Sequence, residues 1–210
     1  MKYVIGSPLL NNAIGEKGHF VAGQTEFDPD TLFRAIADGV ADGGEILVCD
    51  DVGDEWADLI GVHQGTQPKK ISFYHAKHDK EVGLGASPLH IVVSQATKNL
   101  GRMVLSDADI AAKHGKWNAM YLGTAMLRIV RGNAATLAND FSTANMAPDT
   151  IRRVFIVESS LSRQELVDQF AAIEDGALPR PNFVQLYWLL MSFISAAIEV
   201  GAFPYVVCRK

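Results

Sequence analysis

The 210-residue sequence contains few cysteines, and this scarcity limits the kind of protein it encodes. Cys49 and Cys208 are too few for a disulfide framework, so we expect reduced thiols in a cytoplasmic protein. No basic segment followed by an apolar segment opens the chain, which argues against secretion. The formal net charge of -5 supplies no overall positive field to hold nucleic acid, although a local basic groove could still do so.

The sequence also lacks an apolar run long enough to cross a bilayer comfortably. The longest one, residues 183–198, is interrupted by Gln185 and stopped by Glu199. Because a membrane-spanning helix needs about 20 apolar residues, we interpret this run as a buried core helix and expect no membrane partner. The same helix could form a homodimer interface.

The length fits a single domain, residues 1–210, with a core at about residues 28–160 and a C-terminal helical elaboration at 161–210. Helices are expected at 28–43, 87–100 and 116–130. Two more are expected to begin at the capping box of Ser162 and Glu165 and at Asn182. Strands are expected at 2–5, 45–50, 58–63, 70–77, 153–158 and 205–208. This order predicts an α/β fold with a mixed central sheet flanked by helices.

Acidic residues gather between the second and third of these expected strands, at Asp50, Asp51, Asp54, Glu55 and Asp58. A solvated turn between strands would account for Asp and Gly here. Asp58, however, directly precedes Leu59 and Ile60, so its backbone should already belong to a buried strand. A buried carboxylate needs a cation or a hydrogen-bond partner, and a divalent metal ion would supply the cation.

The expected strand at 70–77 ends in polar residues. Because side chains alternate along a strand, His75 and Lys77 share one face with Ile71 and Phe73. A lysine near a metal-held carboxylate can orient or deprotonate a water molecule, and a histidine can serve as a ligand or base. The alternative is a strand end that simply emerges into solvent. On the next helix, Gln95 and Lys98 fall on one face.

Taken together, these segments resemble the PD-(D/E)XK nuclease superfamily. Asp58 matches the first acid of that pattern, Lys77 its lysine and Gln95 the glutamine of its following helix, while His75 stands where the family usually has Asp or Glu. The resemblance covers residues 28–100. Within it, the combination of motifs is similar to nuclease-like domains associated with bacterial restriction and phage-defence systems.

The resemblance implies a restriction-endonuclease-like core and a metal-dependent hydrolase that cleaves DNA phosphodiester bonds in restriction, phage defence or repair. It implies Asp58, His75, Lys77 and Gln95 as catalytic residues. The expected ligands of Mg²⁺ or Mn²⁺ are Asp51, Glu55, Asp58 and His75, and Lys98 is the expected substrate contact. DNA or RNA, together with a helicase or other defence protein, are the implied partners. Because His75 replaces an acid, the alternative is a non-catalytic interaction module of a defence or repair assembly.

Overall fold

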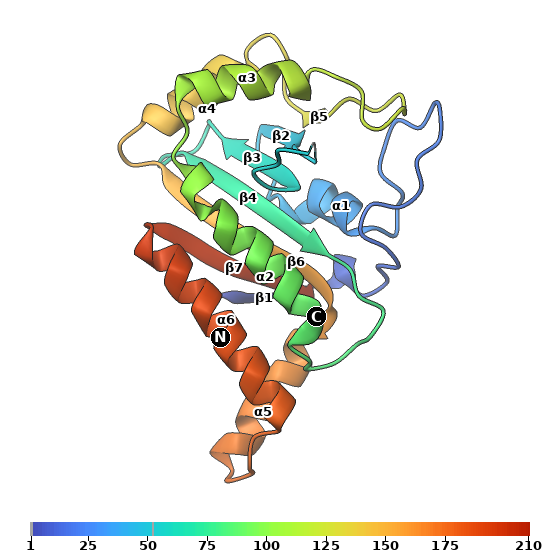
Figure 1. Cartoon of the computed structure of the whole chain (residues 1–210), viewed down its shortest axis with the longest axis vertical. Helices are drawn as coiled ribbons and strands as arrows, with labels where there is room; N and C mark the ends of the chain where they lie inside the picture. Colours follow the sequence, from blue (N-terminus) through green and yellow to red (C-terminus); the bar gives the residue numbers. More distant parts are fainter. Residues whose placement is uncertain (1, 52) are drawn as a thin grey trace.

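The computed structural model describes residues 2–51 and 53–210, and within these residues the chain is an α/β fold with one seven-stranded mixed sheet and six α-helices (Figure 1). The strand order is β1-β7-β6-β4-β3-β2-β5. The strands are β1 Val4–Ser7, β2 Ile46–Cys49, β3 Leu59–His63, β4 Lys70–Lys77, β5 Ile129–Arg131, β6 Ile151–Ser162 and β7 Ala202–Arg209. The pairs β1–β7, β7–β6 and β6–β4 are parallel, whereas β4–β3, β3–β2 and β2–β5 are antiparallel.

Helices cover both faces of this sheet. They are α1 Leu32–Ala35, α2 Ser87–Asn99, α3 Asp107–Trp117, α4 Leu137–Met146, α5 Arg163–Glu174 and α6 Pro181–Glu199. Figure 1 shows α2 and α6 crossing one face, with α1 against the other. Two apolar cores result, because β4 alternates its side chains between them. Ile71 and Phe73 pack in the core beneath α2 and α6, and Tyr74 and Ala76 pack in the core beside α1.

The strands on either side of the acidic segment form where the sequence predicts them. β2, β3 and β4 carry apolar residues along most of their length and are buried, as expected of inner strands covered on both faces. Ser162 caps α5 by accepting a hydrogen bond from the backbone N–H of Glu165 at 3.4 Å. These elements confirm the predicted α/β order in the central part of the chain.

Two predicted helices are wrong: one begins later than expected and the other does not form. The helix expected at 28–43 begins only at Leu32, because Thr31 and not Asp28 provides the N-cap, and it continues as a π-helical turn at Ile36–Val40. The helix expected at 116–130 does not form. α3 ends at Trp117, Leu122 and Gly123 adopt positive φ angles, and the chain turns back into β5. An αL turn of this kind cannot continue a right-handed helix.

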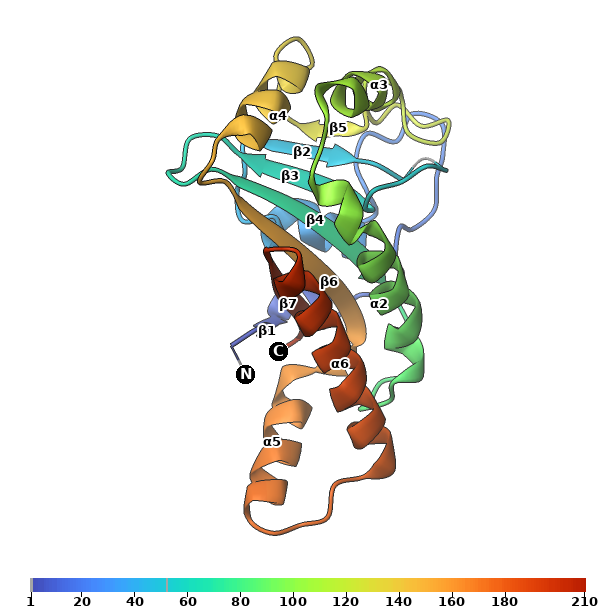
Figure 2. The same cartoon turned by 60° about the vertical axis from the view of Figure 1, so that its left-hand side comes forward.

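The C-terminal helices extend beyond the sheet, where Figure 2 shows α5 and α6 projecting together as a hairpin. The buried side of α6 consists of Phe183, Leu186, Leu190, Phe193 and Ala197. Its other side exposes Trp188 and Ile198. By length and composition, α6 is the one helix in the described part of the chain that could cross a membrane, so the expected absence of a membrane partner stays a prediction.

Candidate functional site

The predicted site residues that flank β2, β3 and β4 lie at one end of these strands. Because β3 is antiparallel to both neighbours, the ends of β2 and β4 lie beside the start of β3. The acidic segment follows β2, Asp58 precedes β3, and His75 and Lys77 close β4. The antiparallel pairing therefore brings together residues from three separate parts of the chain.

Three carboxylates form a close group at this end of the strands. They are Asp51, Glu55 and Asp58, and we call them the acidic triad. One carboxylate oxygen from each lies within 4.8 Å of the other two. Oxygen atoms at this spacing suit a hard divalent cation such as Mg²⁺ or Mn²⁺. His75, the fourth expected ligand, is not part of the close group.

Asp58 is the most deeply buried member of the triad, with 6% of its surface exposed. Its Oδ2 accepts a hydrogen bond from the backbone N–H of Ala76 at 2.8 Å, the only hydrogen bond that its carboxylate accepts from the described residues. An ionised carboxylate has about four acceptor positions, so this group is sparsely satisfied. Burial raises the pKa of Asp58 to about 7, and nearby Glu16 and Glu55 add to the rise.

Asp51 is better supplied with donors than Asp58. It accepts hydrogen bonds from the Tyr121 hydroxyl and from Lys17 Nζ, which lies 2.9 Å from Asp51 Oδ2. Burial alone would raise the pKa of Asp51, but these two hydrogen bonds outweigh burial and lower the pKa below its usual value. For Glu55, burial and the nearby charge of Asp51 raise the pKa. Within the triad the pKa is therefore lowered at Asp51 and raised at Glu55 and Asp58.

Asp50 points to a separate and fully buried cluster. Its two oxygens lie 2.9 and 2.8 Å from Lys113 Nζ, and they also accept hydrogen bonds from Trp117 Nε1 and from the backbone N–H of Trp56, both at 2.7 Å. Lys113 also donates to the carbonyl of Asp54. This cluster ties α3 to both ends of the acidic segment, which fixes the loop that carries Glu55.

His75 and Gln95 place unsatisfied polar atoms in the interior. Neither His75 Nε2 nor Gln95 Oε1 has a hydrogen-bond partner among the described residues, and His75 is only 2% exposed. Burial, with a smaller contribution from the positive charge of Lys98, lowers the pKa of His75 to about 3. The imidazole is therefore neutral at physiological pH. Lys98 itself is exposed on α2.

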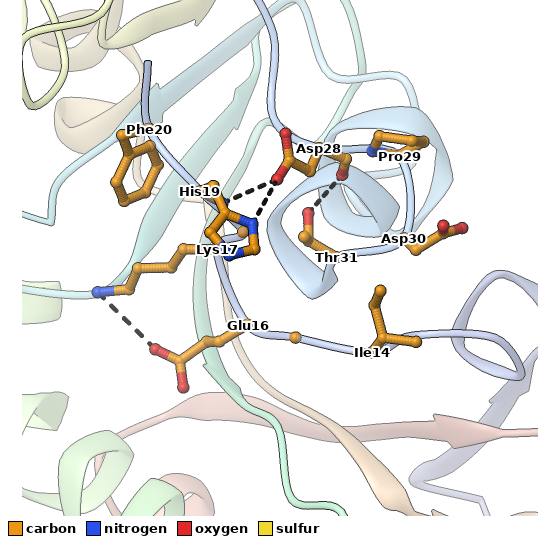
Figure 3. A pocket seen from close by; sticks show the side chains of 11 residues that line it. Ile14, Glu16, Lys17, His19, Phe20, Asp28, Pro29, Asp30 and Thr31 are labelled. Atoms are coloured by element: carbon orange, nitrogen blue, oxygen red, sulfur yellow. Dashed lines mark hydrogen bonds and ion pairs between the residues drawn. The ribbon is translucent and has the colours of Figure 1, made fainter.

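Lys77 is paired with a residue of the N-terminal loop. Its Nζ lies 2.9 Å from Glu16 Oε2, and Glu16 in turn lies 3.8 Å from the ammonium of Lys17. Figure 3 shows the Glu16 and Lys17 side chains meeting at their ends. The loop from Ile14 to Phe20, together with Asp28–Thr31, lines an open pocket of about 660 Å³. Lys17 therefore joins this pocket to the acidic triad.

Several residues of the site have no local signal in the sequence. Glu16 and Lys17 lie in a loop with no helical or strand pattern, and Lys113 and Tyr121 are 50 or more positions away from their aspartate partners. The one available signal is Lys113, which falls on the buried side of α3. A lysine is rarely buried without an acidic partner, so its position could have indicated a partner such as Asp50.

Comparisons with known proteins give two distant relatives, both named bifunctional purine biosynthesis protein PurH. The protein from Staphylococcus carnosus (strain TM300) is 29% identical over 129 residues, which cover 59% of this chain and 25% of the relative. The protein from Staphylococcus saprophyticus is 23% identical over 159 residues, which cover 75% of this chain and 32% of the relative. The chain thus spans about a quarter to a third of these relatives. No family model and no solved structure matches.

These relatives overturn the assignment to the PD-(D/E)XK nuclease superfamily, because the proteins that this chain resembles are named for purine biosynthesis and not for nucleic-acid cleavage. The predicted DNA-cleaving hydrolase is wrong, and so is its alternative, the nuclease-fold module of a restriction, phage-defence or repair assembly. The structure gives a physical reason at one position. His75, which replaces the family's second acid, is buried and neutral and offers no negative charge to a metal ion.

Proposed function

We propose that this chain is a divalent-cation-binding domain that takes part in purine biosynthesis, where it holds a phosphorylated purine compound through Mg²⁺ or Mn²⁺. The observation that carries the proposal is the acidic triad, and above all Asp58, a buried carboxylate with a single hydrogen bond from the described residues. A buried carboxylate in this state gains most from a cation. Both relatives are named for purine biosynthesis, which supports the choice of a purine compound as the ligand.

In this proposal Asp51, Glu55 and Asp58 bind the ion through carboxylate oxygens, the ligand type that Mg²⁺ and Mn²⁺ favour. When bound, the ion supplies positive charge to a phosphate group. We assign Lys98 to the same phosphate, because it is exposed on α2 and its charge acts on Glu55. His75 and Gln95 would offer buried polar atoms to the ligand or to ordered water, and Lys77 would balance Glu16.

Other expectations from the sequence stay predictions beside this one. They are binding to DNA or RNA, a helicase or defence-system partner, a homodimer, location in the cytoplasm, and the restriction-endonuclease-like arrangement of the core strands. Binding of a purine compound through an ion at the acidic triad requires none of these expectations to hold.

A thermal-shift experiment with Mn²⁺ tests the proposal. At about 100 times its Kd, a bound ion should raise the Tm of the wild-type chain by about 5–10 °C. AMP or GMP should raise it further only when Mn²⁺ is present. Asp58→Asn should abolish both effects, whereas Asp54→Asn should keep them, because Asp54 lies exposed in the same loop and outside the triad.

Two results would count against the proposal in different ways. An unchanged Tm with Mn²⁺, or a shift that persists in Asp58→Asn, would refute the ion site. A shift with Mn²⁺ that duplex DNA increases and purine nucleotides do not would keep the ion and refute the purine ligand.

A further inference from the structure

The N-terminal loop already delivers a positive charge to the acidic triad. Lys17 Nζ lies 2.9 Å from Asp51 Oδ2, and its charge also acts on Asp58 and Glu55. The carboxylates around Lys17 in turn change its pKa. Burial lowers its pKa, but the hydrogen bond to Asp51 and the surrounding carboxylates raise it overall, so the ammonium form is held firmly.

The loop is fixed on both sides of Lys17, so the ammonium does not reach the triad by chance. Before it, the carbonyls of Gly15 and Glu16 accept hydrogen bonds from the backbone N–H groups of Leu32 and Phe33 at 3.1 and 3.0 Å. These N–H groups open α1 and have no partner within the helix. The loop is therefore anchored to the start of a helix that is buried in the core.

After Lys17, the chain turns sharply against Asp28. Gly18 has a φ of +85°, and a Cβ atom there would lie 2.4 Å from Asp28 Oδ2. The same carboxylate oxygen accepts the backbone N–H of His19 at 2.8 Å. Only glycine fits this position without strain. Figure 3 shows how the turn leaves the Lys17 side chain directed away from Asp28.

A divalent cation at the acidic triad and the Lys17 ammonium would both bind the Asp51 carboxylate. Mg²⁺ binds carboxylate oxygens at about 2.0–2.1 Å, so an ion on Asp51 Oδ2 would lie within a few ångströms of the ammonium, which is itself 2.9 Å from that oxygen. Two positive charges at this range repel each other strongly in a partly buried site. The ion and the Lys17 ammonium should therefore compete for the Asp51 carboxylate.

We propose that Lys17 is a built-in counter-ion of Asp51, Glu55 and Asp58 that competes with the divalent cation and sets its affinity. This inference rests on the proposed function, because it assigns a regulator to the same ion site. It predicts the reverse of the usual result of mutating a site residue, since removing the Lys17 charge strengthens binding.

Isothermal titration of the full chain with MnCl₂ alone tests the inference. Lys17→Gln should bind Mn²⁺ roughly tenfold more tightly than the wild type, an effect of the size expected for a partly buried charge contact. Lys17→Arg keeps the positive charge and should bind no more tightly than the wild type. Lys116→Gln, which removes an equal charge from an exposed position on α3, should match the wild type.

The outcomes separate the inference from the proposed function. Mn²⁺ binding that is equal or weaker in Lys17→Gln than in the wild type would overturn the competition while leaving the ion site in place. The weaker case would show that Lys17 assists binding. If neither the wild type nor Lys17→Gln binds Mn²⁺, the ion site itself is refuted and the competition with it. A melting curve without metal confirms that each variant is folded.

Discussion

Asp50 and Asp51 are adjacent in the sequence, yet their carboxylates lie in surroundings of different kinds. Asp50 is fully buried, and its oxygens accept hydrogen bonds from Lys113, Trp117 and the backbone of Trp56. Asp51 belongs to the acidic triad, where three carboxylates share the ammonium of Lys17. In the first region one carboxylate has its own buried cation, whereas in the second three carboxylates surround one ammonium.

The difference separates a structural use of acids from a functional one. A buried carboxylate with a full set of donors holds its surroundings in place and has no capacity left for a ligand. A buried carboxylate with one donor, as at Asp58, is costly to ionise unless a cation arrives. The structural cluster also fixes the loop that carries Glu55, so one region supports the geometry of the other.

The largest effect should come from removing the cation of the structural cluster. Lys113→Met leaves the Asp50 carboxylate buried without its ion-pair partner, and the free energy of unfolding should fall by about 3–5 kcal/mol. Urea unfolding at pH 7 would measure this loss. Lys116→Met, on an exposed side of the same helix, should change stability by less than about 0.5 kcal/mol. Equal losses of stability in Lys113→Met and Lys116→Met would show that Lys113 does not stabilise the Asp50 cluster.

The next effect concerns Asp58 and pH. Its pKa is about 7 in the folded chain against an ordinary value of 3.8, so the folded state holds a proton that the unfolded state releases between these values. Stability without metal should therefore fall as pH rises through this window. At about 1.4 kcal/mol per pKa unit, the loss reaches as much as about 4 kcal/mol.

Asp58→Asn should remove this part of the pH dependence, because an amide does not titrate. Urea unfolding of both chains from pH 4 to pH 8, with chelator present, would measure it. His75 acts at the acidic end, since its lowered pKa makes stability fall as pH drops from about 6.5 toward 3 in both chains. Parallel pH profiles for the wild type and Asp58→Asn above pH 5 would contradict the account of the triad.

A smaller effect should follow from the loss of one neutral donor to Asp50. Trp117→Phe keeps an aromatic ring against Trp56 but removes the Nε1–H that lies 2.7 Å from Asp50 Oδ1. The expected loss of stability is about 1–3 kcal/mol. Mn²⁺ affinity should remain within about twofold of the wild type, because Lys113 still holds the loop. A loss of affinity larger than the loss of stability would show that the two regions are less separate than described.

The sequence predicts the triad better than its surroundings, for a physical reason. Asp51, Glu55 and Asp58 lie between two strands joined by local antiparallel pairing, so their nearness follows from a short stretch of chain. Lys17, Lys113 and Tyr121 reach the same place through tertiary packing, which no local pattern records. The failed helix at 116–130 has a related cause, because its spaced apolar residues belong to a turn and an isolated bridge between Met120 and Leu127.

The most direct test of an ion at the acidic triad is anomalous diffraction from crystals soaked in MnCl₂. The account predicts a manganese peak at about 2.0–2.3 Å from oxygens of Asp51, Glu55 and Asp58, with the Lys17 ammonium displaced from Asp51. A fully soaked crystal with no peak among these three carboxylates, and with Lys17 still on Asp51, would contradict it.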